Sequence, residues 1–320
     1  MRIAFVGKGG SGKTTSAAVF ARLLAASGHR VVAVDADINQ HLGVALGHEG
    51  PPPRAMGTDL PWLKDHLRGT NPRIPSADVM IKTTPPGRGS RLVHLDPDDE
   101  VLRRYAAPAE VPYVVTGEFA ESDIGVSCYH SKTGAVELWL NHLVDGPGEY
   151  VVVDMTAGAD AFASGLFTRF DLTVLVCEPT RRGVGVYRQY ASHAAEFGVP
   201  LRVLGNKVTD TADEEWLRAE VDKVEPGALL GCVHHSAWVR AAERGTAAPV
   251  AELEPVNRAA FEAVRAALDA QPRDDAFWDR YHRTTIDFHL RNAAAWGNRS
   301  TGTDLAEQID PEFTYPVPVS

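Results

Sequence analysis

Residues 7–15 read GKGGSGKTT. This stretch matches the pattern G-x-x-x-x-G-K-[ST], in which glycines let backbone N–H groups turn inward around phosphate oxygens. It follows a short apolar run at residues 2–6 and precedes a segment, residues 13–27, with apolar side chains at helical spacing. A phosphate loop needs this position, after a buried strand and at the start of a helix whose dipole adds positive charge. The stretch therefore predicts a nucleotide-binding P-loop.

Each residue type in the loop suits a part of a nucleotide. Lys13 is expected to reach the β- and γ-phosphates of ATP, and the Thr14 hydroxyl is expected to coordinate Mg²⁺. The other residues of the loop are expected to contact the nucleotide through backbone N–H or hydroxyl groups: Gly7, Gly9, Gly10, Ser11, Gly12 and Thr15.

Beyond the loop, apolar strands and amphipathic helices alternate for most of the chain. Residues 30–35 (RVVAVD) form a second apolar strand, so strand, loop, helix and strand make a βαβ unit with parallel strands. The sequence predicts a doubly wound α/β domain with a mostly parallel sheet, a P-loop NTPase fold, over residues 1–270. Further strands are predicted at residues 91–95, 111–115, 150–154, 172–177, 201–204 and 229–233, and helices at 62–68, 132–143, 184–197, 212–224, 236–244 and 256–269.

The pattern changes near the C-terminus, where we expect a helical extension over residues 271–320. Residues 274–296 are rich in aromatic and histidine side chains and predict one long helix. Residues 297–320 are predicted to be a loose tail. Packing of the aromatic stripe on the main domain is favoured over binding to a partner, because apolar stripes on helices usually face a core.

Composition narrows the environment in which the chain works. Its 320 residues are 44% hydrophobic and 23% charged, as in ordinary globular proteins. The net charge of −10 argues against non-specific binding to nucleic acid and against docking on an anionic membrane. The cysteines Cys128, Cys177 and Cys232 are scattered, and there is no signal-peptide pattern or apolar run of roughly 18 residues. We therefore expect a cytoplasmic protein with reduced thiols.

Aspartates stand at the ends of two predicted strands. Asp35 ends the strand at residues 30–35 and is followed by Asp37, and Asp154 ends the strand at residues 150–154. The C-terminal ends of parallel strands meet at the edge of the sheet where the phosphate loop lies. We therefore expect these carboxylates beside Mg²⁺ and the attacking water. Each aspartate alone could instead cap a helix or make a turn.

The early lysine of the loop, Lys8, points to one group of P-loop proteins. The run KGGSGKTT resembles the deviant Walker A motif of the ATPase family that contains MinD, ParA, the nitrogenase iron protein and the CO dehydrogenase maturation ATPase CooC. Within this family the chain most resembles CooC-like proteins. The resemblance implies that Lys8 crosses a dimer interface to the partner's nucleotide, and that ATP binding produces a homodimer with nucleotide between the protomers.

The resemblance also covers the strand ends. The runs VDAD at residues 34–37 and DMTAG at residues 154–158 are similar to the switch motifs of the family. They imply that Asp35 and Asp154 hold water molecules of Mg²⁺ and that Asp37 positions the hydrolytic water.

A third similarity concerns the base of the nucleotide. The run GNK at residues 205–207 is similar to a family motif whose asparagine meets adenine, which implies this role for Asn206. Residues 233–236 read VHHS, where the family often has a proline-containing loop. This departure leaves the base-contacting loop open.

A pair of potential metal ligands, Cys128 and His130, precedes the helix predicted at residues 132–143. CooC-like proteins have a C-x-C pair at this location, and two protomers pool their pairs around a metal at the dimer interface. Thiolate and imidazole both suit Zn²⁺, Ni²⁺ and Cu⁺, so the resemblance implies a transition-metal site between protomers. The alternative is a buried cysteine beside a histidine that caps the helix or faces solvent.

Three functions are consistent with these features. The resemblance favours a CooC-like dimeric ATPase that hydrolyses ATP with Mg²⁺ and assists metal insertion into a client metalloenzyme. A MinD- or ParA-like positioning ATPase needs a basic membrane helix or a DNA-binding face, and the mixed charges of the C-terminal extension and the net charge of −10 disfavour both. A small-molecule kinase or synthetase ranks last, because the sequence has no signature of an acceptor site.

Overall fold

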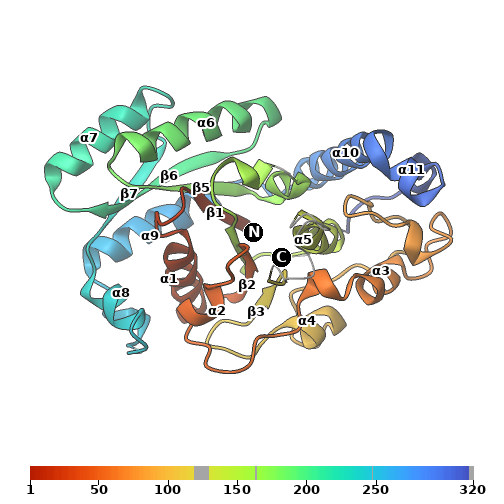
Figure 1. Ribbon diagram of the computed structural model, residues 1–320, viewed down its shortest axis with the longest axis horizontal. Coiled ribbons are helices and arrows are strands. Elements are labelled where there is room, and N and C mark those ends of the chain that lie inside the picture. Colours follow the sequence, from red (N-terminus) through yellow and green to blue (C-terminus); the bar gives the residue numbers. More distant parts are fainter. Residues whose placement is uncertain (119–129, 163, 247, 317–320) are drawn as a thin grey trace.

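A seven-stranded sheet forms the centre of the computed structural model, which describes residues 1–118, 130–162, 164–246 and 248–316 (Figure 1). The strand order is β3-β2-β4-β1-β5-β6-β7, and all neighbouring strands are parallel. The order extends in both directions from β1, which confirms the predicted doubly wound fold. The strands are β1 (Arg2–Gly7), β2 (Arg30–Ala36), β3 (Tyr113–Val115), β4 (Glu149–Met155), β5 (Leu172–Cys177), β6 (Leu201–Val208) and β7 (Leu229–His234).

Helices cover both faces of the sheet, because alternate residues of each strand point to opposite sides. In β1, Ala4 and Val6 join one hydrophobic cluster, whereas Ile3 and Phe5 join the other. The first cluster is completed by α3 (Leu60–Arg68), α4 (Glu100–Tyr105), α5 (His130–His142), α6 (Arg181–Phe197) and α7 (Thr211–Asp222), and the second by α1 (Lys13–Ala26), α2 (Leu42–Ala45), α8 (Ala237–Ala242) and α9 (Pro255–Asp269).

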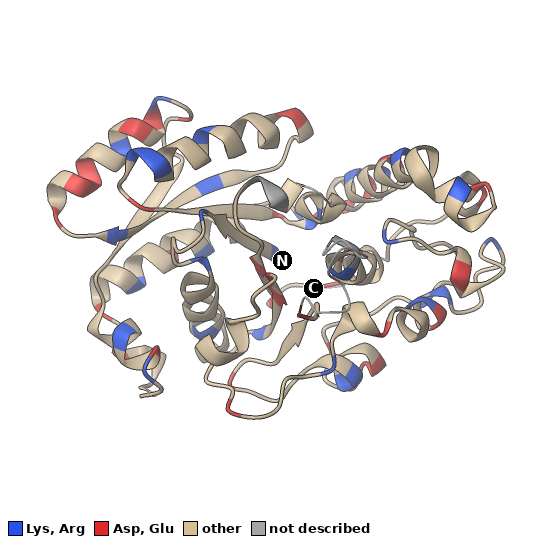
Figure 2. Ribbon diagram, viewed as in Figure 1, with Lys and Arg blue, Asp and Glu red and all other residues tan. Residues whose placement is uncertain are grey.

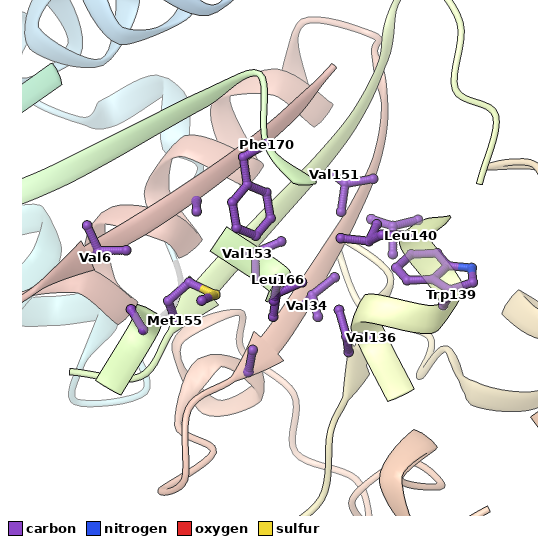
Figure 3. Close-up of a cluster of buried hydrophobic side chains, with 14 of the residues drawn as sticks. Val6, Val34, Val136, Trp139, Leu140, Val151, Val153, Met155, Leu166 and Phe170 are labelled. Atoms are coloured by element: carbon purple, nitrogen blue, oxygen red, sulfur yellow. The ribbon is translucent and has the colours of Figure 1, made fainter. Parts of the chain in front are cut away.

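The first cluster holds α5 against the strands that carry the predicted switch aspartates. Figure 3 shows Val34 of β2 beside Val136 of α5, and Val151 of β4 beside Leu140 of α5. These side chains are fully buried, and each buried aliphatic side chain contributes about 1.5–3 kcal/mol relative to an exposed one. The packing therefore fixes the position of α5 along the strands, relative to the C-terminal ends of β2 and β4.

The predicted strand at residues 91–95 is wrong. Only Val93 makes a bridge, with Leu143, and this bridge lies outside the sheet. The Val93 N–H donates to the carbonyl of His142 at 2.9 Å, and Val93 in turn accepts from the Val144 N–H. This apolar run thus packs at the end of α5 instead of joining the sheet. The sequence analysis also missed α2 and α4, which are short.

The C-terminal extension packs on the main body. The helix α10 (Asp275–Asn292) continues through a π-helical turn, η7 (Ala293–Gly297), into α11 (Asn298–Thr301), so the predicted long helix is confirmed and ends a little later. Trp278 and Tyr281 of its aromatic stripe are buried, as expected.

Among the described residues no helix is both long and apolar enough to cross a membrane. The 3-10 helices are η1 (Met56–Thr58), η2 (Ala77–Val79), η4 (Gly158–Phe162), η5 (Gly165–Arg169), η6 (Val250–Glu252) and η8 (Leu305–Gln308).

The prediction of a loose tail after residue 296 is also wrong for the part that the structure describes. Leu305 and Tyr315 are buried. Asp310 accepts from the Arg88 guanidinium at 2.8 Å, and the Tyr315 hydroxyl donates to the carbonyl of Asn141 at 2.5 Å. The partners of the tail lie far earlier in the chain, so no local pattern in the tail could reveal them.

Candidate functional site

Glycines shape the loop between β1 and α1. Gly12 has φ 94°, in the left-handed region, and a Cβ there would lie 2.2 Å from Nδ2 of Asn206. A Cβ on Gly7 would lie 2.6 Å from the carbonyl oxygen of Val176. Only glycine fits both positions. No side chain caps the N-terminus of α1, so its first N–H groups remain available to an anion in the loop.

Lys13 lies buried at the start of α1, with its Nζ 3.9 Å from Oδ2 of Asp37. Asp37 also accepts from the N–H of Asn39 at 3.0 Å, which orients its carboxylate at the end of β2. The P-loop lysine and one switch aspartate therefore face each other across the site.

Two further aspartates lie side by side on neighbouring strands. Asp35 of β2 is in register with Asp154 of β4. The Thr14 hydroxyl donates to Oδ2 of Asp154 at 2.6 Å. The other oxygen of Asp154, Oδ1, is buried and has no hydrogen-bond partner among the residues that the structure describes. The structure thus brings Thr14, Asp35 and Asp154 together, as the sequence suggested.

The protonation of these carboxyl groups reflects their burial. Burial, with the nearby charge of Asp154, raises the pKa of Asp35 to about 8. Two hydrogen bonds from the N–H groups of Leu42 and Asp37 oppose this rise. Burial also raises the pKa of Asp154 to about 7, although the Thr14 hydroxyl opposes it. Crowded buried oxygens that lack a full set of partners fit a hard divalent cation such as Mg²⁺.

Lys8 lies on the rim of the site, where its Nζ is 3.2 Å from Oε2 of Glu178. Glu178 also pairs with Lys207, whose Nζ is 2.8 Å from Oε1 and donates to the carbonyl of Gly10 at 2.6 Å. Hydrogen bonds from Lys207 and Lys8 lower the pKa of Glu178. The Lys8 side chain is 38% exposed, so its pair with Glu178 contributes little stability and can exchange readily.

The cavity over the loop has two parts. The larger, about 750 Å³, is lined by Lys13, Thr14 and Asp37. The smaller, about 220 Å³, lies beside Asn206 and His235. The two parts adjoin, since they share four lining residues: Gly12, Thr15, Lys207 and Glu243.

Glu243 and Asn206 occupy particular places in this cavity. The Thr15 hydroxyl donates to Oε1 of Glu243 at 3.2 Å, at the junction of the two parts. Nδ2 of Asn206 donates to the carbonyl of Ser11 at 2.7 Å, which ties β6 to the loop. Asn206 therefore lines the smaller part, where its predicted contact with adenine stays a prediction. His234 and His235, in the run where the sequence left the base-contacting loop open, line the same part.

The sequence analysis missed Glu178, Lys207 and Glu243. Glu178 directly follows β5, so the rule that drew attention to Asp35 and Asp154 could have found it. Lys207 was read only as a neighbour of Asn206. Glu243 follows α8 and belongs to no motif, and only the tertiary structure brings it to Thr15.

The predicted transition-metal ligands lie outside the part of the chain that the structure describes. Cys128 lies outside the described residues, and so does the side chain of His130, whose backbone begins α5. In the described part of the chain, no group of three or more His, Cys, Asp or Glu side chains could hold a metal ion. Cys177 and Cys232 are buried, as expected for core residues.

Comparisons with known proteins agree with this geometry. Residues 3–248 match the CobQ/CobB/MinD/ParA nucleotide binding domain. The carbon monoxide dehydrogenase accessory protein CooC of Rhodospirillum rubrum is 27% identical over 270 residues, which cover 84% of this chain and 96% of that protein. An uncharacterized ATP-binding protein of Methanocaldococcus jannaschii is 30% identical over 239 residues, covering 73% of this chain and 84% of that protein.

A solved structure shares the fold at much lower identity. The septum site-determining protein MinD of Pyrococcus horikoshii, solved with Mg-ADP, superposes with a TM-score of 0.53 and 15% identity. The match covers 83% of this chain and 95% of that one.

Proposed function

The chain belongs to the family of CobQ/CobB/MinD/ParA nucleotide-binding domains, and from this membership we propose that it is an Mg²⁺-dependent ATPase that works as a dimeric switch. The observation that carries the proposal is that Lys13, Thr14 and Asp37 line one cavity over the phosphate loop. Behind it Asp154 accepts from Thr14 and lies in register with Asp35. These groups match the charge of a triphosphate and the ligands of a hard cation.

We assign the parts of ATP by position in the cavity. Lys13, the uncapped start of α1 and the loop residues Gly7, Gly9, Gly10, Ser11, Gly12 and Thr15 bind the phosphates. The larger part of the cavity supports this assignment, since Lys13 and Thr15 line it. Asn206 lies on the smaller part, on the side proposed for adenine.

The cation site is proposed at Thr14, with Asp35 and Asp154 holding it through water. Oδ1 of Asp154 has no hydrogen-bond partner among the described residues, and the pKa of both carboxyl groups is raised. Both observations support this proposal, because a cation would offset both. When bound, Mg²⁺ supplies positive charge to the phosphate oxygens.

Hydrolysis is assigned to Asp37 and to Lys8. Asp37 faces Lys13 at the end of β2, which suits a group that orients water at the γ-phosphate. Lys8 reaches the nucleotide of the partner protomer after it leaves Glu178, a step that the exposed ion pair makes easy. ATP hydrolysis therefore depends on the dimer, because Lys8 acts on the partner's nucleotide as an arginine finger supplied in trans does.

The downstream role that we propose is CooC-like assistance to a client metalloenzyme. The match to CooC of Rhodospirillum rubrum supports it, since that relative is covered almost completely. The pair Cys128 and His130, contributed by both protomers, is the proposed site for Zn²⁺ or Ni²⁺ in transit. The alternative is a positioning ATPase like MinD or ParA without metal, which the shared fold with MinD favours.

Native mass spectrometry of the Asp37→Ala protein tests the switch and the metal together. We expect this variant to bind ATP but not to hydrolyse it, so that ATP traps a dimer. We expect one metal ion for each trapped dimer when Ni²⁺ or Zn²⁺ is supplied, and its loss in Asp37→Ala combined with Cys128→Ser. The protein should be purified without a metal-binding tag.

The outcomes separate the two levels of the proposal. An ATP-dependent dimer without metal in Ni²⁺, Zn²⁺ and Cu⁺ would remove the metal role and leave the switch. Normal ATP turnover by Asp37→Ala would contradict the role of Asp37. Asp275→Ala, an exposed aspartate in the first turn of α10, is the matched control and should behave as the wild type.

A further inference from the structure

A separate hollow of about 340 Å³ lies between the main body and the C-terminal extension. It is bounded by α3, the segment that follows it, α5 and α11, on the side of the molecule where α3 and α11 are labelled in Figure 1. Among the described residues, none of its lining residues lines the nucleotide cavity. The residues from the extension, Trp296, Ser300 and Thr301, also lie beyond the part that matches the family.

Trp296 lines this hollow from a π-helical turn, which is a rare backbone conformation. Trp296 belongs to the π-helical turn η7, and π-helical turns occur frequently at functional sites. Its indole N–H donates to Oδ1 of Asn292 at 3.1 Å, which fixes the ring, yet the residue is 40% exposed. The next residue, Gly297, is buried, and a Cβ there would lie 2.7 Å from the side chain of Leu305. The turn therefore packs against the main body, while the indole ring of Trp296 remains accessible to a ligand.

Two lysines give the hollow a positive charge. Neither Lys64 nor Lys82 forms a close ion pair within the part of the chain that the structure describes, although Asp78 shares the lining and the charge of Lys82 acts on the buried Glu137. Burial lowers the pKa of Lys64, and Asp78 on the same wall opposes that shift only at longer range. Asp78 itself accepts from the Ser76 hydroxyl at 3.2 Å. A partly desolvated ammonium without a close counter-ion favours an anion from solution.

We propose that this hollow binds a small aromatic anion, a carboxylate or phosphate monoester on a single ring. The anionic group binds Lys64 and Lys82, and the ring packs on Trp296 and the apolar wall made by Ile81 and Leu138. The hydroxyl group of Ser300 supplies a further donor. A volume of 340 Å³ lies at the lower end of the range for ligand pockets, about 300–1,000 Å³, which suits one ring and not a nucleotide.

Such a ligand would join the extension to the main body. Lys64 belongs to α3 and Leu138 to α5, whereas Trp296 belongs to the extension, so one small molecule contacts all three. Binding therefore stabilises the packing of α11 on α3 and α5, and the thermal midpoint of unfolding rises with ligand concentration. This site is independent of the nucleotide site and of the function proposed for it.

Fluorine NMR with the full chain tests the proposal directly. The probes are 4-fluorobenzoate and 4-fluorophenyl phosphate, with 4-fluorobenzyl alcohol as the uncharged ring. We expect at least one anionic probe to bind with a Kd of about 1 mM or tighter, and the alcohol to bind about tenfold more weakly or not at all. Lys64→Gln, Lys82→Gln and Trp296→Ala should each weaken the bound anion about tenfold.

Two controls separate this site from other anion sites. Lys223→Gln removes an exposed lysine of the same charge beside α7 and should bind the probe as the wild type does. Lys13→Ala removes the phosphate lysine and should also leave the probe bound. Loss of probe binding in Lys13→Ala would show that the probe binds at the nucleotide site, and this would overturn the proposal. So would the absence of binding by both anions up to about 10 mM, or unchanged binding in both lysine variants. Circular dichroism checks that each variant is folded. If Lys64→Gln does not fold, Lys82→Gln alone tests the role of the lysines.

Discussion

At the scale of single residues, the two lysines of the phosphate loop lie in different surroundings. Lys13 is buried and faces Asp37, inside the cavity of its own protomer. Lys8 is partly exposed and lies against Glu178, outside that cavity. A buried lysine held in place suits binding of phosphate in cis, whereas a weakly held lysine on the rim suits contact with a second molecule.

Alanine substitution of the two lysines should therefore separate binding from turnover. We expect Lys13→Ala to weaken ATP binding about 100-fold or more, because it removes a charge-assisted contact to the phosphates. We expect Lys8→Ala to bind ATP within about threefold of the wild type but to lose about 100-fold or more in turnover, as loss of a finger in trans would cause. Calorimetry and phosphate release measure the two quantities. Wild-type turnover by Lys8→Ala would exclude its role in trans.

At the scale of elements, the extension supplies the cap that ends α5. The last carbonyl groups of a helix have no partner within the helix. Here the Tyr281 hydroxyl donates to the carbonyl of Leu140 at 2.8 Å, and the Tyr315 hydroxyl donates to that of Asn141 at 2.5 Å. Arg2 of β1 donates to the Leu143 carbonyl at 2.6 Å. The end of α5 is thus held by both termini of the described chain.

Removal of single hydroxyl groups tests this cap. We expect Tyr315→Phe to lower the free energy of unfolding by about 1 kcal/mol, because the buried Asn141 carbonyl loses its donor. We expect about the same from Tyr281→Phe, because the buried Arg2 guanidinium loses an acceptor while the Leu140 carbonyl keeps its bond from Arg2. Tyr187→Phe is the matched control, since the buried Tyr187 hydroxyl has no hydrogen-bond partner in the described part of the chain. That change should be neutral or stabilising. Urea unfolding at one pH measures all three, and equal effects of the three substitutions would contradict the capping role.

At the scale of the whole molecule, a buried charge network joins the ends of the fold. Arg273, just before α10, pairs with Asp145 and Asp171 at 2.7 Å each. Asp145 also pairs with Arg2 of β1 at 2.7 Å. The two ion pairs of Arg273 cross the predicted boundary at residue 270. Removing one partner of a buried pair costs about 3–5 kcal/mol, so the extension is strongly coupled to the body.

The overall charge distinguishes the two downstream roles. The chain carries a net charge of −10, and Figure 2 shows acidic and basic residues interspersed along the helices in this view. A DNA-binding partition ATPase needs a continuous basic face that releases counter-ions.

We therefore expect no binding to plasmid DNA by the ATP-bound Asp37→Ala protein in a gel-shift assay at about 100 mM salt. The same protein without ATP is the control for non-specific retention. ATP-dependent binding that weakens steeply as salt rises would contradict this expectation and support a ParA-like role.

The sequence by itself determined the features that depend on neighbouring residues. The glycines and Lys13 of the loop, the period-two burial of β1 and the aspartates at strand ends follow from local backbone geometry, so they could be predicted together with the parallel sheet. Only the tertiary structure decided the partners of Lys8 and Thr15, which are Glu178 and Glu243. It also decided that Val93 joins the end of α5 and that the tail packs on the body. These contacts join residues far apart in the chain, and such contacts leave no periodicity in the sequence from which they could be inferred.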